Sequence, residues 1–107
     1  MSDNDIHWHD CGISRVVEIP ADARLVFEVD YPVDWERNEF APHRITFDDL
    51  SSHEVHEGPF HGSKTILGTT ISEADEHGTR QVRIETNAGY RLIRCKRWTL
   101  SRGYDAG

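Results

Sequence analysis

Cysteine is scarce in this chain of 107 residues, which contains only Cys11 and Cys95. Two cysteines do not make the disulfide framework of a small secreted domain. The chain also lacks a run of about 18 apolar residues, the length that a helix needs to cross a bilayer. The first residues show no basic segment followed by an apolar one, so no secretory signal peptide is expected. These absences favour a cytoplasmic protein with reduced thiols and no membrane partner.

Positive charge is sparse in the first 60 residues. The whole chain has 12 Lys and Arg against 19 Asp and Glu, a net charge of −7. Residues 1–60 hold 4 basic and 14 acidic residues (net −10), whereas residues 61–107 hold 8 and 5 (net +3). An acidic chain is not expected to bind nucleic acid generically. The uneven charge predicts either pairing between neighbouring strands or two surface patches that steer a charged partner.

The apolar residues, at 36% of the chain, follow one long alternation. Between residues 25 and 36 every second side chain is apolar, in the order Leu25, Phe27, Val29, Tyr31, Val33 and Trp35. Side chains alternate between the two faces of a strand, so one face is apolar and aromatic while the other is acidic. This pattern is typical of an antiparallel sheet that is covered on one side only. Pro32 cannot donate a ladder hydrogen bond, which predicts an edge position, a bulge or a break near Tyr31.

Shorter segments of the same kind follow one another with turn residues between them. We expect strands at residues 13–19, 24–36, 43–48, 51–57, 65–72, 80–86 and 90–100. Regularly spaced short strands without a convincing helical pattern indicate an all-β fold. The prediction is a small antiparallel β-barrel or a two-layer β-sandwich of about seven to eight strands in meander order. We expect one domain over residues 1–107, with a loose leader at 1–7 and a mobile tail at 101–107.

Histidine is over-represented, with seven residues, five of which lie in two loose clusters. In an extended segment His7, His9 and Cys11 share one strand face, and Asp10 lies between them. Nitrogen, sulfur and oxygen ligands of this kind suit zinc. The alternative is a polar, solvent-exposed segment with Trp8 anchored in the core.

The second histidine cluster contains His53, His56 and His61. It is one residue short of the His-Glu-x-x-His zinc motif, which needs histidines four apart on a helix. On a regular strand, His53 and His56 fall on opposite faces. A metal hypothesis therefore uses His7, His9, His53, His56 and His61 as ligands of a divalent metal, against an alternative in which they are ordinary polar residues. Without a metal, no cofactor is expected.

The two cysteines permit two interpretations each. Cys11, beside His9 and Asp10, suits either a reactive thiol or a small buried side chain. Cys95 follows Arg94 and precedes a lysine, so its pKa would fall if it were exposed, whereas its alternation also allows burial. No phosphate-binding loop, nucleophile elbow or Cys-x-x-Cys pair is present, and no catalytic residue is predicted.

A surface for a protein partner is expected near the end of the long alternation. Tryptophan, tyrosine and arginine contribute most of the energy of protein interfaces. The candidate residues, ringed by carboxylates that suit a basic partner, are Tyr31, Asp34, Trp35, Glu36 and Phe40. The alternative for Trp35 is that it caps one open end of a barrel. An edge strand near Pro32 also leaves a strand-paired homodimer open.

Two stretches resemble a known kind of protein: residues 8–10 (Trp-His-Asp) and residues 30–35 (Asp-Tyr-Pro-Val-Asp-Trp). They look like small bacterial β proteins, some of which resemble the immunity proteins of contact-dependent and polymorphic toxin systems. The resemblance implies an intracellular all-β binding protein without enzymatic residues. The expected function is thus a protein–protein interaction module of immunity type. The alternatives are a small metal-binding protein or metalloenzyme that uses the histidines, and a purely structural domain.

Overall fold

The computed structural model describes residues 6–34, 36–62 and 64–103. Eight strands and one 3-10 turn follow in the order β1 (Gly12–Ile19), η2 (Pro20–Asp22), β2 (Arg24–Asp34), β3 (Glu39–Asp48), β4 (Ser52–Glu57), β5 (Lys64–Ile71), β6 (Arg80–Thr86), β7 (Gly89–Cys95) and β8 (Arg97–Arg102). Every strand pair is antiparallel. The expected all-β antiparallel fold is confirmed.

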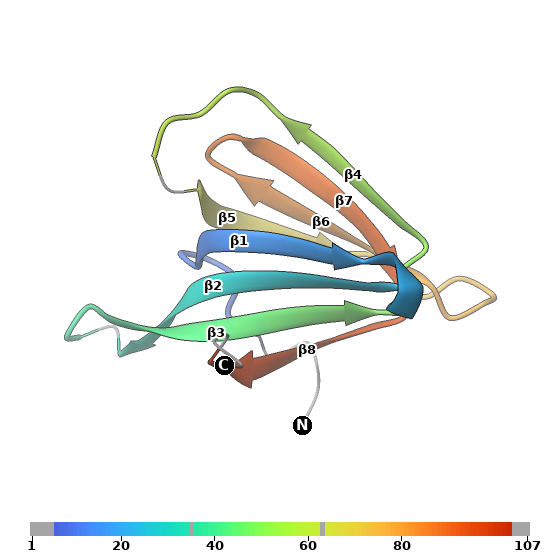
Figure 1. Cartoon of the computed structure of the whole chain (residues 1–107), viewed down its shortest axis with the longest axis horizontal. Coiled ribbons are helices and arrows are strands. Elements are labelled where there is room, and N and C mark those ends of the chain that lie inside the picture. The colour runs from blue at the N-terminus through green and yellow to red at the C-terminus, as the bar shows by residue number, and fades with distance from the viewer. Residues whose placement is uncertain (1–5, 35, 63, 104–107) are drawn as a thin grey trace.

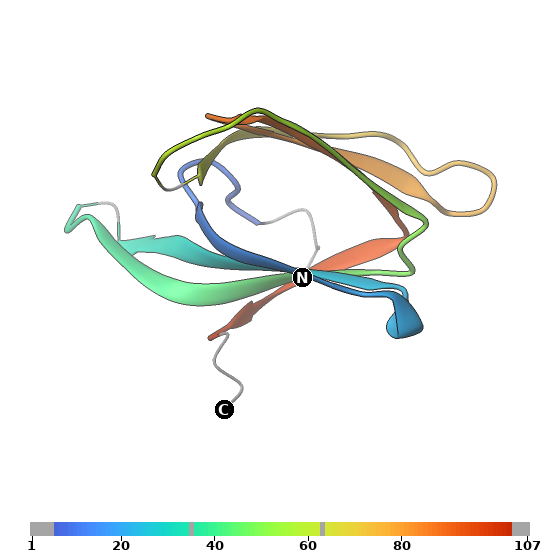
Figure 2. The same ribbon diagram turned by 45° about the horizontal axis from the view of Figure 1, so that its top comes forward.

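The strands form a single sheet in the order β4-β7-β6-β5-β1-β2-β3-β8. Two meanders, β1-β2-β3 and β5-β6-β7, follow the sequence, while β1–β5, β3–β8 and β4–β7 join strands that are distant in the chain. Figure 1 shows the strands fanned out in this order, and in Figure 2 the half that contains β4 to β7 arches over the other half. Because β4 and β8 are the two ends of the strand order and do not pair with each other, the sheet is not closed.

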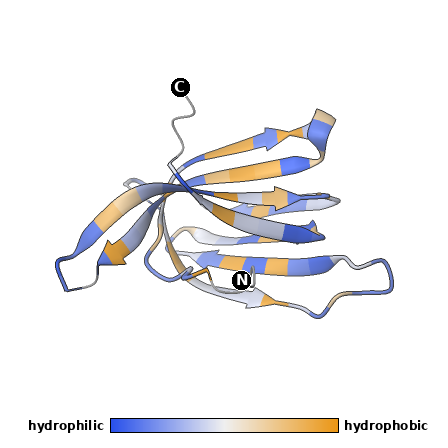
Figure 3. Cartoon of the chain, turned by 90° about the horizontal axis from the view of Figure 1, so that it is seen from below, coloured by the Kyte–Doolittle hydropathy of each residue, from blue (hydrophilic) through white to orange (hydrophobic). Residues whose placement is uncertain are grey.

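One apolar core fills the space between the two halves. The lower half of the sheet contains β1, β2, β3 and β8, and the upper half contains β4 to β7. The lower half contributes the inward-facing side chains of β2 and β3 to the core, where the rings of Phe27 and Phe47 meet edge to face with their centroids 5.4 Å apart. From the upper half the core takes the buried side chains Ile66, Val82, Ile84, Ile93 and Cys95. Apolar and polar segments alternate along the strands in Figure 3, as the two-residue period of a strand requires.

Pro32 lies where the pairing of β2 changes. The β1–β2 ladder ends at Gly12 and Asp30, so beyond this point β2 pairs with β3 alone. A residue without an N–H is tolerated at such a local edge. The register with β3 shifts between Pro32 and Asp34, which is the expected bulge. Val33, at the bulge, is exposed, whereas Pro32, which still pairs with Phe40, is buried.

The predicted strand over residues 90–100 is divided at Lys96 into β7 and β8. The chain crosses here from the upper half of the sheet to the lower one, next to the connection between β3 and β4. Backbone hydrogen bonds join the bend at Lys96 to the β3–β4 connection. The N–H of Ser51 donates to the carbonyl oxygen of Arg94 (2.8 Å), and the N–H of Lys96 donates to the carbonyl oxygen of Asp48 (3.2 Å). The single-strand prediction was therefore wrong, because alternation does not show when a chain changes layers.

Three further boundaries differ from the expectation. The segment expected as a loop before residue 43 is already strand, since β3 begins at Glu39. Ile6, expected in a loose leader, is buried in the core, and Ser101 and Arg102, expected in a mobile tail, belong to β8. Cross-strand pairing and burial order these residues, which their local sequence does not reveal. The rest of the leader and tail, residues 1–5 and 104–107, lies outside the described residues.

Candidate binding surface

The hairpin between β2 and β3 carries most of the predicted partner-binding residues. Asp34 accepts hydrogen bonds at Oδ1 from the backbone N–H groups of Glu36 (3.0 Å) and Arg37 (3.2 Å), which fixes the turn. Phe40 and Val33 are 44% and 45% exposed close to this turn. Together with Glu39, the residues Val33, Asp34, Glu36 and Phe40 are called the hairpin surface below.

Two predicted residues are not included in the hairpin surface as defined here. Tyr31 is half-buried against the core, lies 4.7 Å from the ring of His43 at a tilt of 34°, and accepts a 2.8 Å hydrogen bond from the N–H of His7. It therefore braces the N-terminal segment. Trp35 lies outside the described residues.

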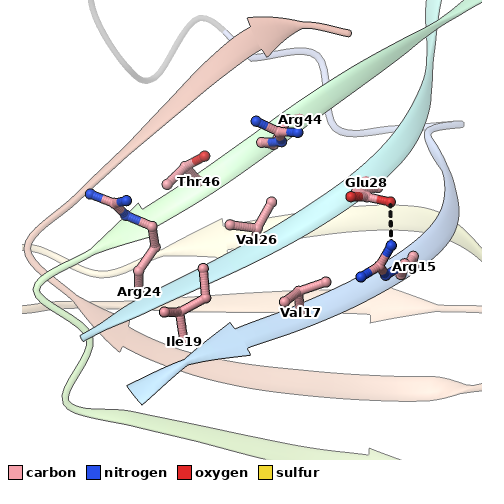
Figure 4. Close-up of a pocket in the computed structure, with 8 residues that line it drawn as sticks. All are labelled: Arg15, Val17, Ile19, Arg24, Val26, Glu28, Arg44 and Thr46. Carbon is pink, nitrogen blue, oxygen red and sulfur yellow. Dashed lines mark ion pairs between the residues drawn. The ribbon is translucent and has the colours of Figure 1, made fainter. Parts of the chain in front are cut away.

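A concavity of about 300 Å³ lies on the outer face of β1, β2 and β3 (Figure 4). Its floor is apolar and includes Val17, Ile19 and Val26. Val26 is only 8% exposed although it points away from the core, because the neighbouring strands and their long side chains rise around it. Phe40 lies on the same strand face as Thr46, which lines the concavity, since the two residues are six positions apart on β3.

Three arginines surround this floor. Arg15, Arg24 and Arg44 account for three of the four basic residues in the first 60 residues of the chain. Arg24 donates to Asp48 at 2.9 Å, and Arg15 lies 4.0 Å from Glu28, the pair marked in Figure 4. The guanidinium groups reach outward, since Arg15 is 67% exposed, whereas the carboxylates lie low beside the strands. An approaching molecule thus meets guanidinium groups around an apolar floor.

The sequence analysis missed this concavity. Its signal is the apolar side chains that interrupt the polar phase of the alternation: Val26 between Leu25 and Phe27, and Val17 after Val16. Two consecutive apolar residues on a strand point to opposite faces. One of each pair must therefore form an apolar patch on the outer face.

A buried ion-pair network lies at the end of β4. Glu57, whose side chain is 2% exposed, accepts hydrogen bonds from Arg91 at both carboxylate oxygens (2.9 and 3.0 Å) and from Lys64 (2.7 Å). Burial alone would raise the pKa of the Glu57 carboxyl, but these hydrogen bonds outweigh it and lower the pKa. Arg91 also lies over the ring of Phe27, 5.6 Å from its centroid. The burial of Arg91 runs against the apolar alternation of Tyr90 and Leu92 in the sequence, which would place Arg91 on the polar face of the strand.

The histidines of the metal hypothesis are not brought together. His53 faces inward and lies 3.2 Å from Glu18, whereas His56 faces outward and stacks on Tyr90 at 4.7 Å, as their odd spacing predicts. His9 lies 3.2 Å from the neighbouring Asp10. His7 is exposed near the N-terminus, and His61 is exposed in the loop before β5. Among the described residues, no group of three or more His, Cys, Asp or Glu side chains is arranged to hold a metal ion.

Both cysteines are buried and free. Burial, with a smaller effect from Asp10, raises the pKa of the Cys11 thiol to about 12. This thiol donates to the carbonyl oxygen of His7 at 3.1 Å. Burial also raises the pKa of Cys95 to about 12. The structure therefore favours the interpretation of both as core residues over that of reactive thiols.

Comparison of the chain with models of protein families and with curated proteins gives no match. In the part of the chain that the structure describes, no helix has the length and apolar character to span a membrane.

Proposed function

We propose that the protein is a protein-binding module of immunity type that acts in the bacterial cytoplasm. It binds a basic protein partner through the hairpin surface, and the concavity on the same sheet face accepts an apolar side chain of that partner. The observation that carries this proposal is the exposure of Phe40 and Val33 among carboxylates at the tip of the hairpin.

Charge supports a basic partner. Asp34, Glu36 and Glu39 place three carboxylates around the exposed apolar pair, against the single guanidinium of Arg37. Arg37 lies 3.8 Å from both Asp34 and Glu39 in exposed, weak ion pairs. The excess of negative charge at the tip adds to the net charge of −7 and would accelerate encounter with a basic surface.

The concavity supports a protein as the kind of partner. Interfaces are built from apolar anchors in desolvated pockets with a polar rim, and arginine is enriched in them. Val17, Ile19 and Val26 supply the apolar pocket, and the three arginines supply the rim. An apolar anchor of the partner would seat here while its basic residues meet the hairpin surface.

A capture experiment with matched variants tests the proposal. The wild type, the double variant Glu36→Lys/Phe40→Ser, and the control Glu76→Lys/Leu67→Ser, which makes the same changes at exposed sites elsewhere, are immobilised and exposed to an extract of the source cells. We expect a basic protein to be retained by the wild type and the control but not by the hairpin variant. Titration of that purified protein should show at least tenfold weaker affinity for the hairpin variant, or about 1.4 kcal/mol.

The variant Val17→Trp, which fills the concavity with an aromatic side chain that strands accommodate well, should weaken the same complex by a similar factor. All variants should unfold at temperatures close to that of the wild type. Equal retention by the hairpin variant and the control, or the absence of any basic protein bound to the wild type, would overturn the proposal.

A further inference from the structure

A second cavity lies between the two halves of the sheet, where β1, the start of β5 and β7 come together. Its volume is about 300 Å³. Ile13 and Val16 give it an apolar side, Lys64 and Arg91 bring two positive charges to its interior, and Arg15 adds a third at its edge, where its guanidinium lies 4.0 Å from Glu28 of the outer face. Ile13 and Lys64 are paired across β1 and β5, so both side chains point to the interior face of the sheet. Basic side chains at this position are unusual, because apolar ones would fill the space without a desolvation penalty.

Arg91 is held in one orientation. Its side chain is 10% exposed, and its Nε and one terminal nitrogen donate to the two oxygens of Glu57 in a bidentate pair. Its other terminal nitrogen lies 3.4 Å from Nε2 of His53. Lys64 is oriented from the same side by its 2.7 Å contact with Glu57. Two of the three cations are therefore preorganised before any ligand arrives, which reduces the entropy lost on binding.

The positive charge of the cavity exceeds what its carboxylate neighbours neutralise. Glu57 contacts both Arg91 and Lys64, so one carboxylate serves two cations. The contact with Glu57 uses one of the three donors of the Lys64 ammonium. Arg15 has a single carboxylate neighbour at 4.0 Å, too long for a hydrogen bond. The attraction of an anion to Arg91 is less weakened by water than at an open surface, because the Arg91 side chain is only 10% exposed.

We propose that this cavity binds a small organic anion, in which a carboxylate or phosphate group is attached to a short apolar part. The oxyanion lies beside the ammonium of Lys64, in front of the guanidinium of Arg91, with Arg15 at the edge of the cavity, and the apolar part packs on Ile13 and Val16. The volume is at the lower end of the range of ligand pockets, about 300–1,000 Å³, and suits a molecule about as large as benzoate. This site is separate from the hairpin surface and does not depend on the proposed protein partner, although Arg15 also lies at the rim of the outer concavity.

Titration with simple probes, followed by the backbone amide signals in NMR spectra, tests this proposal. Benzoate and phenyl phosphate are the anionic probes, and benzyl alcohol is the neutral one. We expect both anions to shift the signals of Ile13, Ser14, Gly62 and Lys64, with weaker binding at high salt, whereas benzyl alcohol leaves them unchanged. If one anion binds at least tenfold more tightly than the other, it identifies the oxyanion that the site prefers.

Matched substitutions locate the site. Arg15→Gln and Lys64→Met should each weaken binding of the preferred anion at least tenfold, or about 1.4 kcal/mol. The controls Arg94→Gln and Lys96→Met remove the same charges from exposed positions on β7 and at the bend that follows it, and should bind like the wild type. Arg15 is 67% exposed, so its substitution is not expected to affect folding. Equal weakening by test and control variants, equal binding of benzyl alcohol, or no shifts in the wild type at about 10 mM anion would overturn the proposal.

Discussion

At the scale of single residues, the turn between β6 and β7 depends on Gly89. Its φ of +145° lies in a region that residues with a side chain rarely adopt. A Cβ atom added there would overlap the carbonyl oxygen of His56 and lie 2.9 Å from the Cα of Glu57. We expect Gly89→Ala to lower the free energy of unfolding by more than about 1 kcal/mol, measured by urea denaturation.

Gly68→Ala is the matched control for this substitution. Nothing lies within 4 Å of a Cβ added at Gly68, so the change should be within about 0.5 kcal/mol. If the two alanine variants were equally stable, the close approach of β4 to Gly89 would not restrict this position.

At the scale of secondary structure elements, the ion-pair network that joins β4, β5 and β7 predicts a pH dependence. The pKa of Glu57 is lowered in the folded protein, so its charged form stabilises the fold. This contribution is fully present above the ordinary carboxyl pKa of about 4.3 and is lost as the pH falls through the lower, folded value. We expect Glu57→Gln to lower the free energy of unfolding by on the order of 3 kcal/mol at pH 7, because it leaves the buried Arg91 and the half-buried Lys64 without their carboxylate.

The difference between the wild type and Glu57→Gln should therefore shrink as the pH is lowered from 7 into the acid range. Glu54→Gln is the control, since Glu54 lies on the outer face of the same strand and pairs only with the exposed His56. Urea denaturation of the three proteins across this range measures the effect. A difference between wild type and Glu57→Gln that does not change with pH would show that the charge of Glu57 does not contribute.

At the scale of the whole molecule, one core joins the two halves of the sheet. Cys11 enters this core from the segment before β1, and Cys95 enters it from the end of β7. Both thiols are buried and have a pKa of about 12, so alkylation in the native state should be very slow at pH 8. We expect both to become reactive together as urea increases, because the halves unfold as one cooperative unit.

Mass spectrometry of the two cysteine peptides after timed alkylation measures this behaviour. The single variants Cys11→Ala and Cys95→Ala show the reaction of each remaining thiol separately. Labelling of Cys95 at clearly lower urea than Cys11 would mean that β4 to β7 open before the rest, and that the chain is not one cooperative domain.

Much of the sheet could be predicted from the sequence because alternation acts locally. The segment from Leu25 to Val29 has the predicted face buried, and Pro32 lies at a local edge beside the predicted bulge. The acidic hairpin surface around Asp34 and Phe40 was also found in this way, since turn residues and alternation are adjacent in sequence. The concavity on the outer face was missed because Val17 and Val26 come from different strands, and only their pairing makes one apolar floor.

The sequence by itself determined the fold class and the two-faced character of the strands, because side-chain direction on a strand depends only on the two-residue period. Tertiary structure alone decided which face is buried where both are plausible. Arg91 is buried on the inner face of β7 while Tyr90 lies on the outer face, because Glu57 arrives from β4 to neutralise the guanidinium. The tertiary structure also decided that the chain turns at Lys96 and that the described histidines stay apart, since both depend on contacts between strands distant in the chain. Both cavities belong to this second group, because each is formed by side chains from several strands.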